Sequence, residues 1–164
     1  KCFHLLPTPE IFIREKTPEL LNTANEIFRA YGSNIRIVHF AEISVLAAAI
    51  SLDADAIAID EKTTRLLMEN PRLLVEILKR TLHAPMTVNE SNLKQFNLMT
   101  RGIKSIRSVE LVTVAYELGI LDSFVTNMPD AKKNLLESVL WGVKLNGCAV
   151  SKEEIAQILR LESR

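Results

Sequence analysis

The chain has 164 residues, of which 48% are hydrophobic and 24% are charged, and its formal net charge is 0. This length predicts one domain with one core, and the composition is that of an ordinary globular protein. A net charge of 0 excludes attraction to polyanions through overall charge, and no apolar run approaches the roughly 18 residues of a membrane span. We therefore predict a single cytoplasmic domain over residues 1–164 that binds no membrane.

Two helices are predicted near the start of the chain. Residues 8–9 and 17–18 are both Thr-Pro, a pair that fits a helix cap followed by a proline in the first turn. Apolar side chains within residues 20–31 share one face of the second helix. Gly32 is expected to end that helix.

A strand, a helix and a second strand are predicted over residues 35–59. The sequence IRIVH at residues 35–39 predicts the first strand. Apolar residues within 41–52 recur at spacings near 3.6, which predicts a core helix with Glu42 in its first turn. Residues 56–59 are few and apolar, which is typical of a strand buried on both faces. Short joints between these elements predict a right-handed crossover and two parallel strands.

Helices predominate in the rest of the sequence. The fold class is therefore predicted to be α/β, a short parallel sheet flanked by helices with a helix-rich C-terminal part. In chain order, the later elements are helices at 64–68 and 73–82 separated by Pro71, a strand at 86–88, a helix from Ser108 to before Gly119, a long helix from Pro129 or Asp130 to Gly147, and a last helix opened by a Ser151 and Glu154 capping box.

Two acidic residues follow the predicted parallel strands. Glu42 comes after the first strand and Asp60 after the second, so both are expected at the edge of the sheet where ligands gather. Carboxylates at such an edge suit Mg²⁺ or Mn²⁺. Each residue also has an ordinary structural alternative, since Glu42 would favour a helix N-terminus and Asp60 a turn.

These residues belong to a longer pattern that resembles the PIN domain family of metal-dependent nucleases. The pattern lies in FAEISVLAAAISLDADAIAIDEKTTR at residues 40–65. Glu42 stands at the start of a helix of small residues, an apolar strand then ends at Asp60, and Arg65 follows within a few residues. SVELVTVAYELGIL at 108–121 and LLESVLWGVKLNGCAVSKEEI at 135–155 are similar to later parts of the family. The resemblance covers roughly residues 9–158. Such domains usually open on a strand ending in a catalytic Asp, so we expect this chain to be a truncated or processed product that lacks that strand.

The resemblance implies a metal-dependent endoribonuclease that hydrolyses RNA phosphodiesters. It also implies roles for individual residues. Those roles are Glu42 and Asp60 as ligands of Mg²⁺ or Mn²⁺, Glu61 and Glu15 as supporting catalytic acids, and Arg65 and Ser108 as contacts to the RNA phosphate. For Glu15, a solvated charge between Arg14 and Lys16 is an equal alternative.

A basic segment supplies the candidate RNA-binding surface. Residues 91–109 contain no acidic residue and four cationic side chains, which are Lys94, Arg101, Lys104 and Arg107. Cations placed together can contact phosphates, although charged runs are usually solvated faces. A non-catalytic PIN-like module that binds RNA or a protein partner, and a homodimer joined through a helical face, stay open alternatives.

Overall fold

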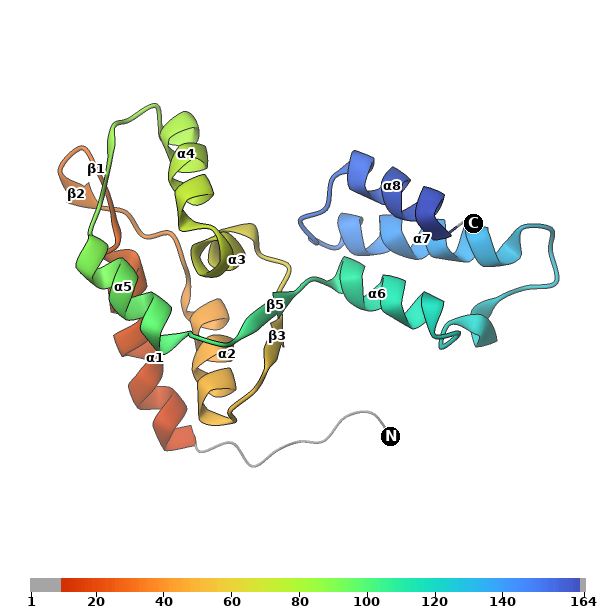
Figure 1. Ribbon diagram of the computed structural model, residues 1–164, viewed down its shortest axis with the longest axis horizontal. Coiled ribbons are helices and arrows are strands. Elements are labelled where there is room, and N and C mark those ends of the chain that lie inside the picture. Colours follow the sequence, from red (N-terminus) through yellow and green to blue (C-terminus); the bar gives the residue numbers. More distant parts are fainter. Residues whose placement is uncertain (1–9, 163–164) are drawn as a thin grey trace. The chain divides into compact units, whose positions relative to one another are not determined.

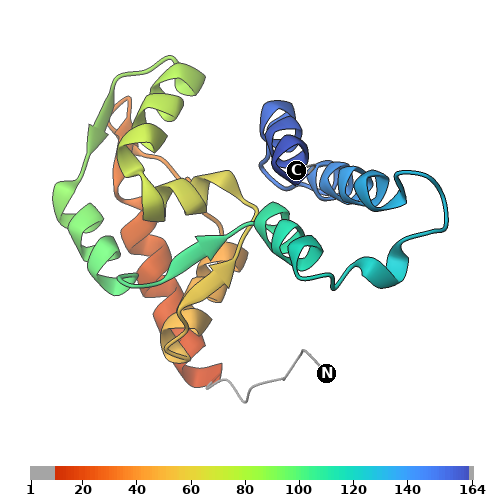
Figure 2. The same cartoon turned by 45° about the vertical axis from the view of Figure 1, so that its right-hand side comes forward.

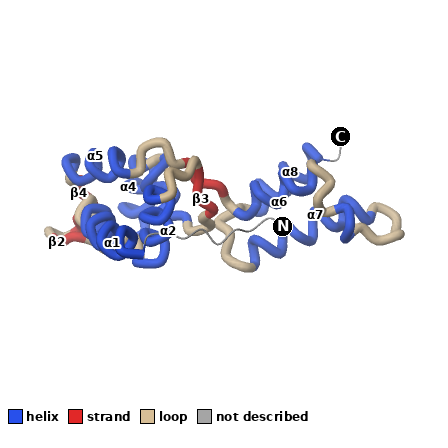
Figure 3. The backbone as a smooth tube through the Cα atoms, turned by 90° about the horizontal axis from the view of Figure 1, so that it is seen from below, coloured by secondary structure: helices blue, strands red, loops and turns tan. Residues whose placement is uncertain are grey.

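The computed structural model describes residues 10–162, and helices make up most of them (Figure 3). The described residues form two compact units, one made of residues up to Ile57 with Lys62–Ser105 and the other of Ala58–Glu61 with residues from Ile106 onward. In chain order, the elements are α1 (Glu10–Asn25), β1 (Phe28–Ala30), β2 (Ser33–Asn34), α2 (Phe40–Ser51), β3 (Ala56–Ala58), α3 (Lys62–Glu69), α4 (Pro71–Leu82), β4 (Met86–Val88), α5 (Glu90–Met99), β5 (Lys104–Ile106), α6 (Ser108–Glu117), the 3₁₀ turn η1 (Asp122–Phe124), α7 (Ala131–Leu145) and α8 (Lys152–Glu162) (Figure 1).

The first unit is built around α1, which packs against α2 and α5. The buried side chains of α1 and α2 lie three or four residues apart, as they must to share one helix face. Leu20 and Ala24 form this face on α1, and Ile43 and Leu46 form it on α2, all with 0% exposure. Phe96 of α5 is also fully buried.

Two small sheets accompany these helices. In the first sheet, β1 lies between β2 and β4 and pairs antiparallel with both. In the second, β3 and β5 run parallel, as their arrows show in Figure 2. The predicted strand at 86–88 is confirmed as β4, and the predicted strand at 56–59 is confirmed as β3. Its exposure alternates, however, because Ile57 and Ile59 are buried while Ala58 is exposed.

The predicted strand at residues 35–39 is wrong, because this segment is irregular. Only its first residue bonds to the sheet, since the Ile35 N–H donates to the Phe28 carbonyl of β1 (3.0 Å), and the backbone further on bonds to one side chain. The Asn25 Oδ1 accepts hydrogen bonds from the backbone N–H groups of Ile37 (2.8 Å) and Val38 (3.1 Å), and the Asn25 Nδ2 donates to the Val38 carbonyl (3.1 Å). The predicted crossover between two neighbouring parallel strands is therefore wrong as well, since β3 takes β5 as its parallel partner.

The N-terminal helices also differ from the prediction. One helix, α1, continues through Pro18, and it ends at Asn25 instead of Tyr31. Phe28–Ala30 leaves the helical pattern because its backbone pairs with two strands, and Gly32, at a φ of 79°, lies in the turn between β1 and β2. The Thr-Pro pair at residues 8–9 lies outside the described residues.

The other predicted helices are confirmed. Pro71 separates α3 from α4, and the Asn70 side chain caps α4 by accepting a hydrogen bond from the Leu73 N–H (3.1 Å). In the second unit, α7 packs against α6 and α8. The second unit has its own apolar core, formed by Val109, Leu136, Leu140, Cys148, Val150 and Ile155.

Replacing Asn25 with Ala should destabilise the first unit. The substitution removes three hydrogen bonds and leaves the backbone of the buried residue Val38 without a partner, so the free energy of unfolding should fall by about 2 to 3 kcal/mol. Urea denaturation measures the loss. Asn22→Ala is the matched control, because Asn22 is exposed on the same helix and should change stability little. Equal effects of the two substitutions would contradict this role of Asn25.

Candidate active site at the carboxyl ends of β3 and β5

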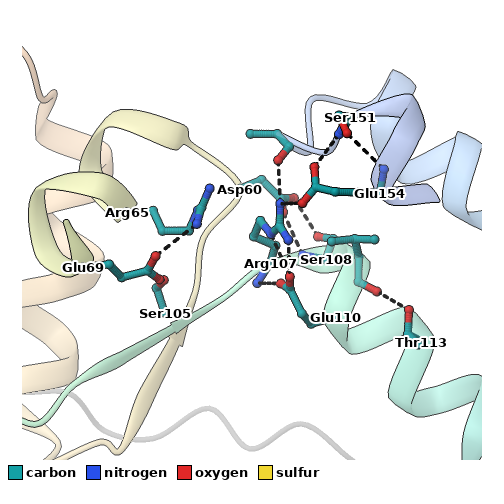
Figure 4. A network of polar contacts seen from close by, with 12 residues as sticks. Asp60, Arg65, Glu69, Ser105, Arg107, Ser108, Glu110, Thr113, Ser151 and Glu154 are labelled. Carbon is teal, nitrogen blue, oxygen red and sulfur yellow. Dashed lines mark hydrogen bonds and ion pairs between the residues drawn. The ribbon is translucent and has the colours of Figure 1, made fainter. Parts of the chain in front are cut away.

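Asp60 lies just beyond β3, and Ser108 opens α6 just beyond β5. The Ser108 backbone N–H donates a hydrogen bond to the Asp60 Oδ1 (2.7 Å), and the Ser108 hydroxyl donates to the Asp60 Oδ2 (2.7 Å) (Figure 4). Because β3 and β5 are parallel, both residues lie at the edge formed by the carboxyl ends of the strands. The carboxylate of Asp60 thus occupies the N-terminus of α6, where negative charge is favoured.

The environment of Asp60 keeps it ionised. Burial alone would raise the pKa of Asp60, but hydrogen bonds from Ser108 and from the Cys148 thiol, with the nearby charge of Arg107, lower it below its ordinary value. Burial and the adjacent Asp60 carboxylate raise the pKa of Cys148, so its thiol stays a protonated donor. Cys148 is buried, but it contacts Asp60, whereas Cys2 lies outside the described residues.

Arg107 ties the start of α6 to the loop before α8. Its guanidinium donates hydrogen bonds to the Glu110 carboxylate, to the Ala149 carbonyl (2.8 Å) and to the Glu154 carboxylate (3.1 Å). These carboxylates outweigh burial and raise the pKa of Arg107. The Arg107 side chain is 15% exposed. Its guanidinium therefore serves contacts within the second unit, and its predicted role in binding RNA stays a prediction.

Glu154 completes this group of contacts. Its Oε2 accepts a hydrogen bond from the Ser151 N–H (2.7 Å), and the Ser151 hydroxyl accepts one from the Glu154 N–H (3.0 Å), which confirms the predicted capping box. Burial would raise the pKa of Glu154, but the bonds from Ser151 and Arg107 lower it. We call the complete set the α6 clasp, and it consists of Asp60, Arg107, Ser108, Glu110, Cys148 and Glu154.

Arg65 makes its contacts in the first unit. It lies on α3, where its Nη1 bonds to the Glu69 Oε2 (3.0 Å), and the other oxygen of Glu69 accepts a hydrogen bond from the Ser105 hydroxyl (Figure 4). The Arg65 Nε is buried and has no hydrogen-bond partner among the described residues. Arg65 therefore keeps one unused donor.

The other predicted acids occupy different surroundings. Glu42 lies in the first turn of α2, as predicted, and its Oε2 is a buried oxygen for which the described residues provide no hydrogen bond. Glu61 is half-buried beside Asp60, and Glu15 is exposed on α1. Because Glu42 belongs to the first unit and Asp60 to the second, their common edge stays a prediction.

The predicted RNA-binding residues divide between the units. Lys94, Arg101 and Lys104 are exposed in the first unit, whereas Arg107 belongs to the second. Lys94 and Arg101 line the same hollow along α5. These exposed cations are available to phosphates, in contrast to Arg107.

The donor set of Asp60 limits what it offers to a metal ion. A carboxylate has about four lone-pair sites, and two hydrogen bonds from Ser108 occupy two of those of Asp60. The other sites remain for a cation, beside the Cys148 thiol that helps to lower the pKa of Asp60. Among residues 10–162, no three His, Cys, Asp or Glu side chains gather as a group that could hold a metal ion. Asp60 therefore fits a divalent ion as one ligand, and further acids must complete the set.

The sequence does not predict the contacts of Asp60 with Cys148 or of Arg107 with Glu154. The four residues are spread over some ninety positions, and local patterns carry no signal for such pairs. The capping box did identify Glu154, but only in its local role. The chain matched no protein-family model, and comparisons with curated proteins and with solved structures gave no match. None of the helices in the described part of the chain is long and apolar enough to span a membrane.

The α6 clasp should make the second unit sensitive to acid. The folded-state pKa values of Asp60 and Glu154 lie below their ordinary values of 3.8 and 4.5, so the folded state binds fewer protons than the unfolded state. Their stabilisation is therefore complete above those ordinary values and is lost as the pH falls through the lowered pKa values. Urea denaturation between about pH 6 and about pH 2 measures this loss. The single tryptophan, Trp141, packs against the core of the second unit and reports its unfolding.

Asp60→Asn should flatten this acid dependence, because the Asn side chain does not titrate. Asp55→Asn is the matched control, since Asp55 is exposed outside the clasp. The control should keep the slope of the parent protein. If the free energy of unfolding of Asp60→Asn falls with pH as steeply as that of the parent, protonation of Asp60 does not contribute to the acid sensitivity of the second unit.

Proposed function

We propose that the chain is a PIN-like, metal-dependent ribonuclease. The observation that carries the proposal is the ionised Asp60 carboxylate at the carboxyl ends of β3 and β5, beside the N-terminus of α6. In α/β proteins, ligands bind beyond the carboxyl ends of parallel strands. The β3 and β5 pair would then belong to the parallel sheet of a PIN-like, three-layer fold.

Each residue takes a definite part in this proposal. A bound Mg²⁺ or Mn²⁺ would activate water and stabilise the charge that develops on the RNA phosphate. Asp60 is the proposed first ligand of that ion, and Glu42, with a buried oxygen for which the described residues provide no hydrogen bond, is the proposed second ligand. Glu61 and Glu15 are the proposed supporting acids. Arg65 is the proposed contact to the RNA phosphate, because a guanidinium forms charge-assisted hydrogen bonds with phosphate oxygens.

A non-catalytic module that binds RNA is the second candidate. It is favoured by the two hydrogen bonds from Ser108 that already engage Asp60, because a carboxylate used for structure contributes less to a metal site. Exposed Lys94, Arg101 and Lys104 would bind phosphates without a metal ion. A protein partner, a homodimer and a cytoplasmic location stay predictions from the sequence.

Cleavage of a single-stranded oligoribonucleotide in the presence of Mn²⁺ tests the leading proposal. Asp60→Asn should abolish cleavage, because the neutral amide is a much poorer ligand for a dication. The fold should survive, since an amide oxygen can still accept the hydrogen bond of the Ser108 N–H, and circular dichroism checks this. Asp55→Asn should cleave like the parent. Full activity of a folded Asp60→Asn variant would refute the assignment.

RNA binding in EDTA separates the two candidates. Parent protein that binds the oligoribonucleotide without cleaving it in Mn²⁺ would favour the binding module. Binding should then weaken as the salt concentration rises. The double variant Arg101→Ala with Lys104→Ala should reduce the slope of log affinity against log salt concentration by roughly 0.7 per lost phosphate contact. Lys79→Ala with Arg80→Ala removes the same charge from exposed positions on α4 and serves as the control. Equal RNA binding by the two double variants would show that Arg101 and Lys104 do not form the RNA-binding surface.

A further inference from the structure

A groove lies between α6 and α8 in the second unit. Its volume is about 320 Å³, and its residues all belong to that unit. Figure 1 shows α6, α7 and α8 together, with α7 packed against both of the other helices. The apolar side chains that line the groove are Val109, Val114, Ile158 and Leu161.

Helix α6 is apolar on two faces. One face, with Val109, Val112 and Tyr116, packs on the core of the second unit. On the other face, Val114 is 49% exposed and Leu118 is 69% exposed. Across the groove, Leu161 of α8 is 53% exposed. A surface helix normally buries one apolar stripe, so a second stripe beside a groove indicates a surface that a partner covers.

Negative charge borders the groove at both ends. At the end near the α6 clasp, the carboxylates of Glu110 and Glu154 share a single cation, Arg107. Towards the other end, the carboxyl group of Glu162 on α8 lies beside that of Glu117 on α6. Burial and this neighbouring charge raise the pKa of Glu162. Like charges at such a position repel each other and favour a cation between them.

The groove is therefore acidic in a chain whose formal net charge is 0. Its lining has two carboxylates, Glu110 and Glu154, and one guanidinium, Arg107. Glu117 and Glu162 do not line it but interact with each other near one end. Lys152 and Arg160 also lie on α8, but neither of them lines the groove. Charge complementarity consequently selects a cationic occupant over an acidic or neutral one.

We propose that the groove between α6 and α8 binds a basic amphipathic helix of a partner protein. Its apolar stripe would cover Val114 and Leu161, and a Lys or Arg would lie between Glu117 and Glu162. Glu110 and Glu117 are seven residues apart on α6, a length of roughly 10 Å, which matches two turns of a helix with apolar anchors at i, i+3 or i+4, and i+7. This interaction surface goes beyond the proposed nuclease and requires no metal ion.

A synthetic amphipathic peptide tests the proposal. The probe carries leucines at helical spacing and lysines beside them, and the matched control peptide replaces each lysine with glutamate. Fluorescence anisotropy should show that the basic peptide binds and that the acidic peptide binds at least about tenfold more weakly, a difference equal to about 1.4 kcal/mol. Equal affinities of the two peptides would overturn the proposal.

Variants of the protein locate the binding site. Leu161→Ser should weaken binding of the basic peptide by about tenfold. Leu145→Ser is the control, because Leu145 is 82% exposed on α7 and does not line the groove. The double variant Glu117→Gln with Glu162→Gln should weaken binding of the basic peptide. The same variant removes the repulsion between the two carboxylates in the free protein, so a loss of folding cannot explain weaker binding.

Two further outcomes would contradict the proposal. Leu145→Ser could weaken binding as much as Leu161→Ser, in which case the peptide binds exposed leucines without selecting the groove. Sedimentation velocity could show a dimer of the parent that Leu161→Ser dissociates, in which case a second copy of the chain covers the groove.

Discussion

The Asp60 carboxylate is the interaction on which the second unit and the proposed chemistry both depend. Its hydrogen bonds to Ser108 join residues 48 positions apart, and its contact with Cys148 reaches the loop before α8. Through Ser108 it satisfies the first N–H of α6 and places negative charge at the positive end of that helix. Arg107, the preceding residue, extends the same group of contacts to Glu154.

The same bonds that stabilise Asp60 restrict its chemistry. A carboxylate that accepts two hydrogen bonds from Ser108 is well oriented and stays ionised, which suits a metal ligand, but those bonds occupy two of its roughly four lone-pair sites. Glu42 shows the opposite state, with a buried oxygen that lacks a hydrogen bond among the described residues. An unsatisfied buried carboxylate oxygen is costly, so a cation or a donor that binds it would stabilise the protein. The nuclease and binding-module proposals differ mainly in whether these two carboxylates act together.

Local patterns predicted most helices correctly, because caps and apolar spacing act within one or two turns. Asn70 and Pro71 set the start of α4, and Ser151 with Glu154 set that of α8. The strand predicted at residues 35–39 was wrong because the side chain of Asn25, distant in sequence, satisfies the backbone of Ile37 and Val38. Asp60 was chosen correctly as a residue at the end of a strand. Its bonds to Ser108 and Cys148 were not predicted, since they depend on tertiary packing.

The most direct test of the central claim is to locate bound Mn²⁺ by paramagnetic broadening in the ¹⁵N amide spectrum. Substoichiometric Mn²⁺ should broaden the signals of Asp60, Glu61 and Ser108 first, and excess Mg²⁺ should restore them. In Asp60→Asn these signals should stay sharp. Broadening that leaves Ser108 unaffected, or that centres on the exposed acids Asp53 and Asp55, would contradict a functional centre at the carboxyl ends of β3 and β5.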